Sequence, residues 1–179
     1  MAITDDMLRV CISEDEIKEY VDRIANQINK EYKNFDPLFI GVLKGAVPFM
    51  TDLMKKININ CTQDYIKVSS YDGVSSTGNV ILKSEMPNIC DRNVIIVEDI
   101  LDTGKTLLKL KSMLLAGGAK SVKICVLLDK PEGRQVDISA DYVGGMVPNE
   151  FVVGYGLDYN ERYRNLPYIG VLKEEVYKK

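Results

Sequence analysis

Residues 94–108 read Val-Ile-Ile-Val-Glu-Asp-Ile-Leu-Asp-Thr-Gly-Lys-Thr-Leu-Leu. The four apolar residues at 94–97 predict a strand that is buried on both faces, because a half-exposed strand would alternate with polar residues. We expect burial to end at Glu98 and Asp99, and a helix to begin after the polar turn 102–106. A buried strand, a polar loop and a helix start are typical of an anion site, since free backbone N–H groups and the positive end of the helix dipole meet there.

The two adjacent acids have to be explained together with the loop that follows them. Carboxylates would repel a phosphate unless they bind something else, such as hydroxyl groups or a divalent cation. Ribose hydroxyls with Mg2+ would satisfy both parts, because Mg2+ is typically held by one or two carboxylates and by substrate oxygens. The stretch therefore predicts a site for a phosphorylated sugar.

Two commoner nucleotide-binding motifs do not fit. A P-loop ending in Gly104-Lys105-Thr106 would need its first glycine at position 99, where Asp99 stands. A dinucleotide-binding turn at Gly154-Tyr155-Gly156 would need a third glycine where Tyr159 stands. An acid in the phosphate cradle and the missing glycine disfavour these two classes.

Composition limits the remaining classes. A chain of 179 residues with 46% hydrophobic content predicts one domain, 1–179, with room for a sizeable core. The net charge of -3 argues against a nucleic-acid partner, and no apolar stretch is long enough to suggest a membrane span or a signal peptide. The four cysteines form no CxxC pair and the chain has no histidine, so the supply of ligands excludes both a zinc site and a Cys-His nucleophile. We expect the four cysteines to be free thiols in a reducing cytoplasm.

The remaining chain alternates between predicted strands and helices. Ser13-Glu14-Asp15-Glu16 has the form of a capping box, and the apolar residues Ile17, Val21, Ile24 and Ile28 follow at helical spacing. The polar stretch 72–79 is expected to be a mobile loop. Further strands are predicted at 38–43, 57–71, 80–82, 122–128, 142–146 and 151–153, and helices at 47–55 and 105–116.

Charged residues follow two more of the predicted buried strands. Lys44 and Gly45 follow 38–43, and Lys130 follows 122–128. Open α/β sheets bind ligands outside the carboxyl ends of their strands, so these lysines are candidate ligand contacts. Each lysine taken alone is equally explained as a solvated charge at a strand end.

Four segments carry a resemblance to a known family. Val97–Thr106 resembles the phosphoribosyl pyrophosphate signature of type I phosphoribosyltransferases. Within that group, 43–46, 69–71 and 151–159 resemble the hypoxanthine-guanine phosphoribosyltransferases, in order and spacing that run through most of the chain. The resemblance implies an α/β fold with a mainly parallel twisted sheet flanked by helices. It also implies a small hood formed by the N-terminal segment and about 138–158.

The resemblance implies a purine-salvage reaction. Phosphoribosyl pyrophosphate and hypoxanthine or guanine would give IMP or GMP and pyrophosphate, with Mg2+ as the cofactor. The protein would work in the cytoplasm as a homodimer or homotetramer, with neither nucleic acid nor membrane as a partner. Two alternatives remain open: a relative that prefers xanthine, and a non-catalytic regulator that binds phosphoribosyl pyrophosphate while contacting RNA or DNA.

The resemblance also implies roles for residues in the central segment. Asp102 would handle the proton at the purine ring, although a helix N-cap is a second reading of this residue. Glu98 and Asp99 would hold ribose and metal. The 5'-phosphate would be bound by Thr103, Gly104, Lys105 and Thr106.

The remaining implied roles lie outside that segment. Lys44, Gly45 and Arg164 would meet pyrophosphate, with a cis peptide bond before Lys44. Lys130 would donate to the 6-oxo group, which favours a 6-oxopurine over adenine. Phe151 would stack on the base, the backbone of Val152 would read its edge, and Asp158 would bind Mg2+ or lie near the guanine amino group. Ser70 and Tyr71 would close as part of a lid.

Overall fold

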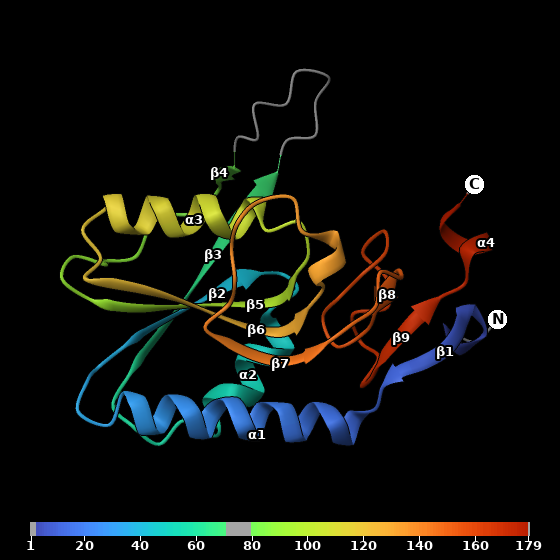
Figure 1. Cartoon of the computed structure of the whole chain (residues 1–179), viewed down its shortest axis with the longest axis horizontal. Helices are drawn as coiled ribbons and strands as arrows, with labels where there is room; N and C mark the ends of the chain where they lie inside the picture. The colour runs from blue at the N-terminus through green and yellow to red at the C-terminus, as the bar shows by residue number, and fades with distance from the viewer. Residues whose placement is uncertain (1–2, 71–79, 179) are drawn as a thin grey trace.

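The computed structural model describes residues 3–70 and 80–178, and a twisted sheet forms its centre (Figure 1). The strand order is β4-β3-β2-β5-β6-β7, and every neighbouring pair is parallel except β3 and β4. The strands are β2 (Leu38–Leu43), β3 (Thr62–Ser70), β4 (Val80–Leu82), β5 (Asn93–Leu101), β6 (Ser121–Asp129) and β7 (Tyr142–Met146). The expected mainly parallel α/β fold is confirmed.

Strand β5 lies inside this sheet and is buried on both faces, as its sequence predicts. Residues Val94, Ile95, Ile96 and Val97 are each 0% exposed. Successive side chains of a strand point to opposite faces, so Ile95 and Val97 join one core cluster and Val94 and Ile96 join another.

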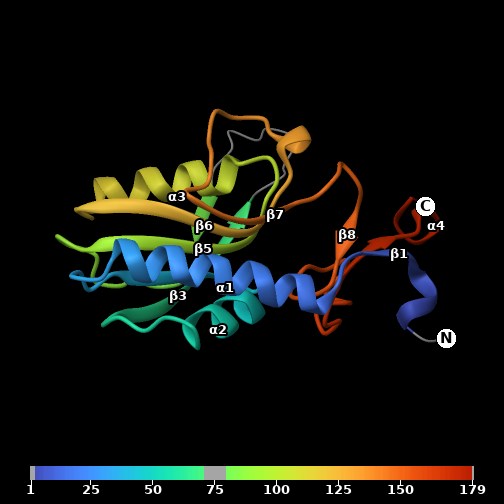
Figure 2. The ribbon, with the colours of Figure 1, turned by 60° about the horizontal axis from the view of Figure 1, so that its bottom comes forward.

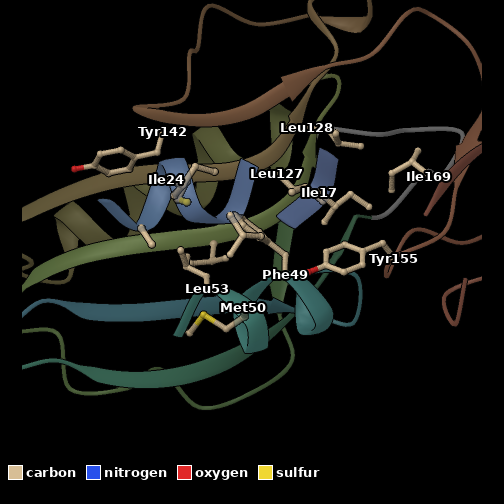
Figure 3. Packing of buried hydrophobic residues seen from close by; sticks show 14 of the residues in the cluster. Ile17, Ile24, Phe49, Met50, Leu53, Leu127, Leu128, Tyr142, Tyr155 and Ile169 are labelled. Atoms are coloured by element: carbon tan, nitrogen blue, oxygen red, sulfur yellow. The ribbon is translucent and has the colours of Figure 1, made fainter. Parts of the chain in front are cut away.

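Helices cover both faces of the sheet, with α1 (Glu14–Glu31) and α2 (Val47–Met54) on one side and α3 (Lys105–Ala116) on the other (Figure 2). The predicted capping box is present, because Glu16 N–H donates to Ser13 Oγ and Ser13 N–H donates to the Glu16 carboxylate. The predicted stripe of α1 is buried, and Figure 3 shows Ile17 and Ile24 in the same cluster as Phe49 of α2. Burial of such a side chain contributes about 2 kcal/mol.

Helix α3 begins at Lys105, and its N-cap is Gly104 in a left-handed conformation, with φ 83°. Asp102 is therefore not the N-cap, and that reading of Asp102 is wrong. A glycine is suited to this position because a left-handed conformation is strained for residues with a Cβ. The helix ends at Ala116, and Gly118 follows with φ 93°, which agrees with the predicted C-terminal stop.

A second, antiparallel sheet lies beyond one end of the main sheet, and both termini lie beside it (Figure 1). Its order is β1-β9-β8, from β1 (Met7–Ile12), β9 (Ile169–Leu172) and β8 (Val152–Val153). A 3-10 helix precedes it at Ile3–Asp6, another occupies Pro131–Gly133, and the short helix α4 spans Glu174–Tyr177. The expected hood boundary differs from this arrangement, because β7 pairs with β6 in the main sheet and the C-terminal strand β9 joins the small one.

Two predicted strands have other bounds. Strand β5 continues past Val97 to Leu101, because Ile100 and Leu101 keep pairing with β6. Strand β3 begins at Thr62 rather than at 57, since Asn29 of α1 holds the preceding segment: its side chain donates to Lys56 O and accepts from Asn58 N–H.

Three further observations concern expectations from the sequence. The Leu43–Lys44 peptide bond is cis, as the resemblance implies. The predicted loop 72–79 and Tyr71 lie outside the described residues, and Ser70 is the last residue of β3. Within 3–70 and 80–178, the helices are too short or too polar for a membrane crossing.

Candidate active site

The candidate residues gather where three parallel strands of the main sheet end. Lys44 follows β2, Asp99 and Asp102 lie at the end of β5, and Lys130 follows β6. Because β2, β5 and β6 are neighbouring parallel strands, their carboxyl ends lie at the same edge. The segment after β8 packs onto this edge, since a Cβ added to Gly156 would lie 2.0 Å from Gly45 O.

Asp99 is 9% exposed, and its carboxylate packs directly against the backbone of Gly45. A Cβ at position 45 would lie 1.7 Å from Asp99 Oδ2, so this close approach requires glycine. Burial, followed by the charge of Asp99, raises the pKa of Glu98 well above its usual range. Burial also raises the pKa of Asp99, although the nearby Arg164 opposes the shift. Two such carboxyls together favour a cation or hydroxyl groups as their partners.

A cavity of about 220 Å3 opens beside these acids. It is lined by the end of β5, the following turn and the start of α3, and among its lining residues are Glu98, Asp99, Asp102, Thr103, Gly104 and Thr106. The first intrahelical bond of α3 runs from Leu108 N–H to Gly104 O, so the preceding N–H groups have no partner within the helix. Free N–H donors and the helix dipole make the cavity suited to a phosphate group. Lys105, predicted for the same loop, is not among the cavity's lining residues and is exposed.

Lys130 joins the end of β6 to Asp102. Its side chain is 14% exposed, and Nζ lies 3.7 Å from Asp102 Oδ2 and donates to Glu150 O at 3.2 Å. A second cavity, of about 360 Å3, is lined by Lys130 and Phe151, among other residues. A half-buried ammonium and an aromatic ring that line one cavity match the contacts that a planar, oxygen-bearing ring would need.

Val152 is the first residue of strand β8 in the small sheet, and Phe151 directly precedes it. The Phe151 ring stacks on Tyr177 of α4, with ring centroids 4.7 Å apart, and meets the edge of Tyr159 at 5.6 Å. Val152 is buried in β8 and pairs with Val171 of β9. Phe151 thus has a neighbour on one face already, which the sequence did not suggest.

Arg164 and Lys44 form the cationic part of the site. Arg164 Nη1 donates to Gly156 O at 2.7 Å, and Nη2 lies 2.8 Å from Asp158 Oδ1. Lys44 Nζ lies 2.7 Å from the carboxylate of Glu161. The two predicted anion-binding cations are therefore brought to one loop, and acids of that loop pair with both.

A family model of the phosphoribosyl transferase domain matches residues 13–160. The chain belongs to the phosphoribosyltransferase family. The match spans the main sheet and the cavity at the end of β5, whereas Glu161 and Arg164 lie beyond its end.

Individual relatives of this phosphoribosyltransferase extend the likeness to nearly the whole chain. The hypoxanthine-guanine phosphoribosyltransferase of Streptococcus pneumoniae is 51% identical over 177 residues, 98% of this chain and 98% of that protein. The bifunctional protein TilS/HprT of Listeria monocytogenes is 53% identical over 97% of this chain, which spans 27% of that protein's length. A crystal structure of a hypoxanthine phosphoribosyltransferase from Staphylococcus aureus has a TM-score of 0.95 at 44% identity, covering 99% of this chain and 97% of that one.

Three acids of this phosphoribosyltransferase, Glu98, Asp99 and Asp158, were expected to bind metal, but they do not form one group of ligands. In the described part of the chain, no three His, Cys, Asp or Glu side chains are arranged to hold a metal ion. Asp158 is engaged by Arg164 and by Glu161 N–H, at 2.8 Å in each case. Glu98 and Asp99 are adjacent carboxyls, a donor set that fits Mg2+ when substrate oxygens complete the shell.

Two residues of the site were missed by sequence reasoning. Arg134 donates to the backbone carbonyls of Leu101 and Asp102 and pairs with Asp129, so it ties together the ends of β5 and β6. No periodic pattern marks this arginine. Glu161 contacts Lys44, and the only sequence signal for Glu161 is its spacing of three residues from Arg164.

Proposed function

We propose that the chain transfers the phosphoribosyl group from phosphoribosyl pyrophosphate to N9 of hypoxanthine or guanine, giving IMP or GMP and pyrophosphate. Membership of the phosphoribosyltransferase family and the names of its relatives support the reaction class. The observation that carries the choice of base is the approach of Lys130 Nζ, which lines one cavity, to within 3.7 Å of Asp102 Oδ2, which lines the other. A lysine offers only donors, so it selects a 6-oxo group over the 6-amino group of adenine.

Each part of the site has a role in this proposal. The turn Thr103–Thr106 holds the 5'-phosphate at the start of α3, and Glu98 and Asp99 bind the ribose hydroxyls. Lys44 and Arg164, with the backbone of Gly45, bind pyrophosphate and stabilise the charge that develops as it departs. Asp102 handles the proton at the purine ring, and Lys130 Nζ lies 3.7 Å from Asp102 Oδ2.

The remaining contacts of the proposal concern the base and the metal. Phe151 stacks on the purine, the backbone of Val152 reads its edge, and Asp158 lies near the guanine amino group or the metal. Mg2+, held by Glu98 and Asp99, would neutralise charge on the pyrophosphate group. Ser70 and Tyr71 would belong to a lid that excludes water from the reacting ribose.

We further propose one domain over 1–179, with the small sheet as its hood, working in the cytoplasm as a homodimer or homotetramer. The four free cysteines support a reducing compartment. Light scattering at working concentration tests the assembly, and a monomer there would contradict it.

A spectrophotometric assay with phosphoribosyl pyrophosphate and Mg2+ tests the function, with hypoxanthine, guanine, xanthine and adenine offered separately. Nucleotide should form from hypoxanthine or guanine and not from adenine. Lys130→Met should raise the KM for the base, whereas the matched control Lys55→Met removes an exposed lysine paired with Asp52 and should leave the KM unchanged. Absence of turnover with every base, despite binding of phosphoribosyl pyrophosphate, would favour the non-catalytic regulator, and turnover of xanthine would revise the base preference.

A further inference from the structure

The Glu161 carboxylate lies between the two cations assigned to pyrophosphate. One oxygen, Oε2, is 2.7 Å from Lys44 Nζ, and the other, Oε1, is 3.3 Å from Arg164 Nη2. The hydrogen bond from Lys44 lowers the pKa of Glu161, so the carboxylate is ionised at neutral pH. An ionised carboxylate that bridges two cations makes the same charge-assisted contacts that a phosphate group would make.

The backbone of a tight turn places this carboxylate. Asn160 and Glu161 both have left-handed φ values, 50° and 63°, which are uncommon for residues other than glycine. Tyr159 and Arg162 bridge across the turn, and Glu161 N–H donates to Asp158 Oδ2 at 2.8 Å. Lys44, which follows β2 and lies 117 residues earlier in the chain, contacts this turn through Glu161. The turn therefore holds an acid against the two cations in a strained backbone conformation.

Arg164 keeps one donor that no acid of the loop satisfies. Its Nη1 donates to Gly156 O and its Nη2 faces Asp158 and Glu161, but within the described structure the buried Nε has no hydrogen-bond partner. A buried donor without a partner carries a desolvation penalty. The carboxylates of Asp158 and Glu161 both face Nη2 and leave Nε unpaired, whereas a phosphate group in place of Glu161 brings a third oxygen.

We propose that Glu161 occupies the place of a phosphate group between Lys44 and Arg164 and must leave both cations when pyrophosphate binds. Glu161 thereby weakens the binding of pyrophosphate and favours its release, while it keeps both cations oriented. The inference rests on the proposed function, because that function supplies pyrophosphate as the ligand of this pair.

Titration calorimetry with magnesium pyrophosphate tests the inference on the full chain. Glu161→Gln keeps the size of the side chain and removes its charge, so its Kd for pyrophosphate should be about three- to tenfold lower than that of the wild type, the effect of losing one or two exposed ion pairs. Tighter binding distinguishes this role from a structural one, since damage to the site would weaken binding.

Glu14→Gln is the matched control. Glu14 pairs with Lys18 at side-chain exposures of 55% and 62%, close to the 64% and 56% of Glu161 and Lys44, but lies at the start of α1. The Glu14→Gln variant removes the same net charge as Glu161→Gln and should leave the Kd for pyrophosphate unchanged. Ribose 5-phosphate is the control ligand, because its phosphate belongs to the turn at 103–106, and its Kd should be the same in all three proteins.

Three results would overturn the inference. Equal or weaker binding of pyrophosphate by Glu161→Gln would show that Glu161 does not compete with the anion. An equal gain in Glu14→Gln would assign the effect to net charge alone. Failure of the wild type to bind magnesium pyrophosphate would overturn the proposed function as well, whereas the first two results leave that function intact.

Discussion

Replacing Arg134 by methionine is expected to destabilise the fold at the edge that carries the site. The guanidinium pairs with Asp129, and both side chains are 16% exposed. Removing one partner of a buried pair typically costs about 3 to 5 kcal/mol, because the other charge stays buried. The pair keeps some exposure, so its loss should cost an amount near the lower end of that range. The carbonyls of Leu101 and Asp102 each also lose a hydrogen-bond donor worth about 1 kcal/mol. We therefore expect a loss of about 3 to 5 kcal/mol in the free energy of unfolding.

Urea titration followed by circular dichroism measures this loss, and the melting temperature should fall by about 6 to 20 °C for a chain of this length. Lys18→Met is the control, since Lys18 pairs with Glu14 and Asp15 at exposed positions and its loss should cost less than about 1 kcal/mol. Adding Asp129→Asn to Arg134→Met should restore part of the stability, because the buried charge is then removed. A loss below about 1 kcal/mol in Arg134→Met would refute the reasoning that solvent does not screen this pair.

Three further changes test other parts of the structure. Asp102→Asn should lower turnover by a factor of about 100 or more while leaving the melting temperature nearly unchanged, because Asp102 does not cap α3; a stability loss with turnover retained would contradict this. Gly156→Ala should lower the free energy of unfolding in urea titrations by about 1 to 3 kcal/mol, because the new Cβ would lie 2.0 Å from Gly45 O and φ of Gly156 is 103°. An unchanged free energy of unfolding would show that the loops at Gly45 and Gly156 can separate. Glu31→Gln should lower the free energy of unfolding at pH 7 by up to about 1 kcal/mol. The hydrogen bond from Lys123 lowers the pKa of Glu31 below its ordinary 4.5. The stabilisation by Glu31 is therefore present above pH 4.5 and is lost as the pH falls through the lowered pKa. The melting temperatures of the wild type and Glu31→Gln should accordingly converge in acid.

Sequence patterns predicted the elements whose causes are local. The apolar run Val94–Val97 and the helix over 105–116 depend on neighbouring residues and on periodicity, and both are present. The capping box at Ser13 also needs only a four-residue pattern. Family resemblance, rather than periodicity, assigned roles to the site residues.

Features that depend on distant partners were not predictable in this way. The extension of β5 to Leu101 is caused by pairing with β6, and the late start of β3 is caused by Asn29 of α1. The exclusion of Asp102 as a cap follows from the left-handed Gly104, which the sequence pattern left open. Arg134 and Glu161 become visible only when charged side chains from different strand ends are placed together.

The pairing of β1 with β9 delays the folding of the small sheet relative to the main sheet. In the described structure β1 pairs only with β9, with Met7 opposite Leu172. On a ribosome, β1 must remain without this partner until Ile169–Leu172 has been synthesised, with Leu8 and Val10 accessible to chaperones. The strands of the main sheet all precede β9 in the chain, so the region around Phe151 should mature after the main sheet.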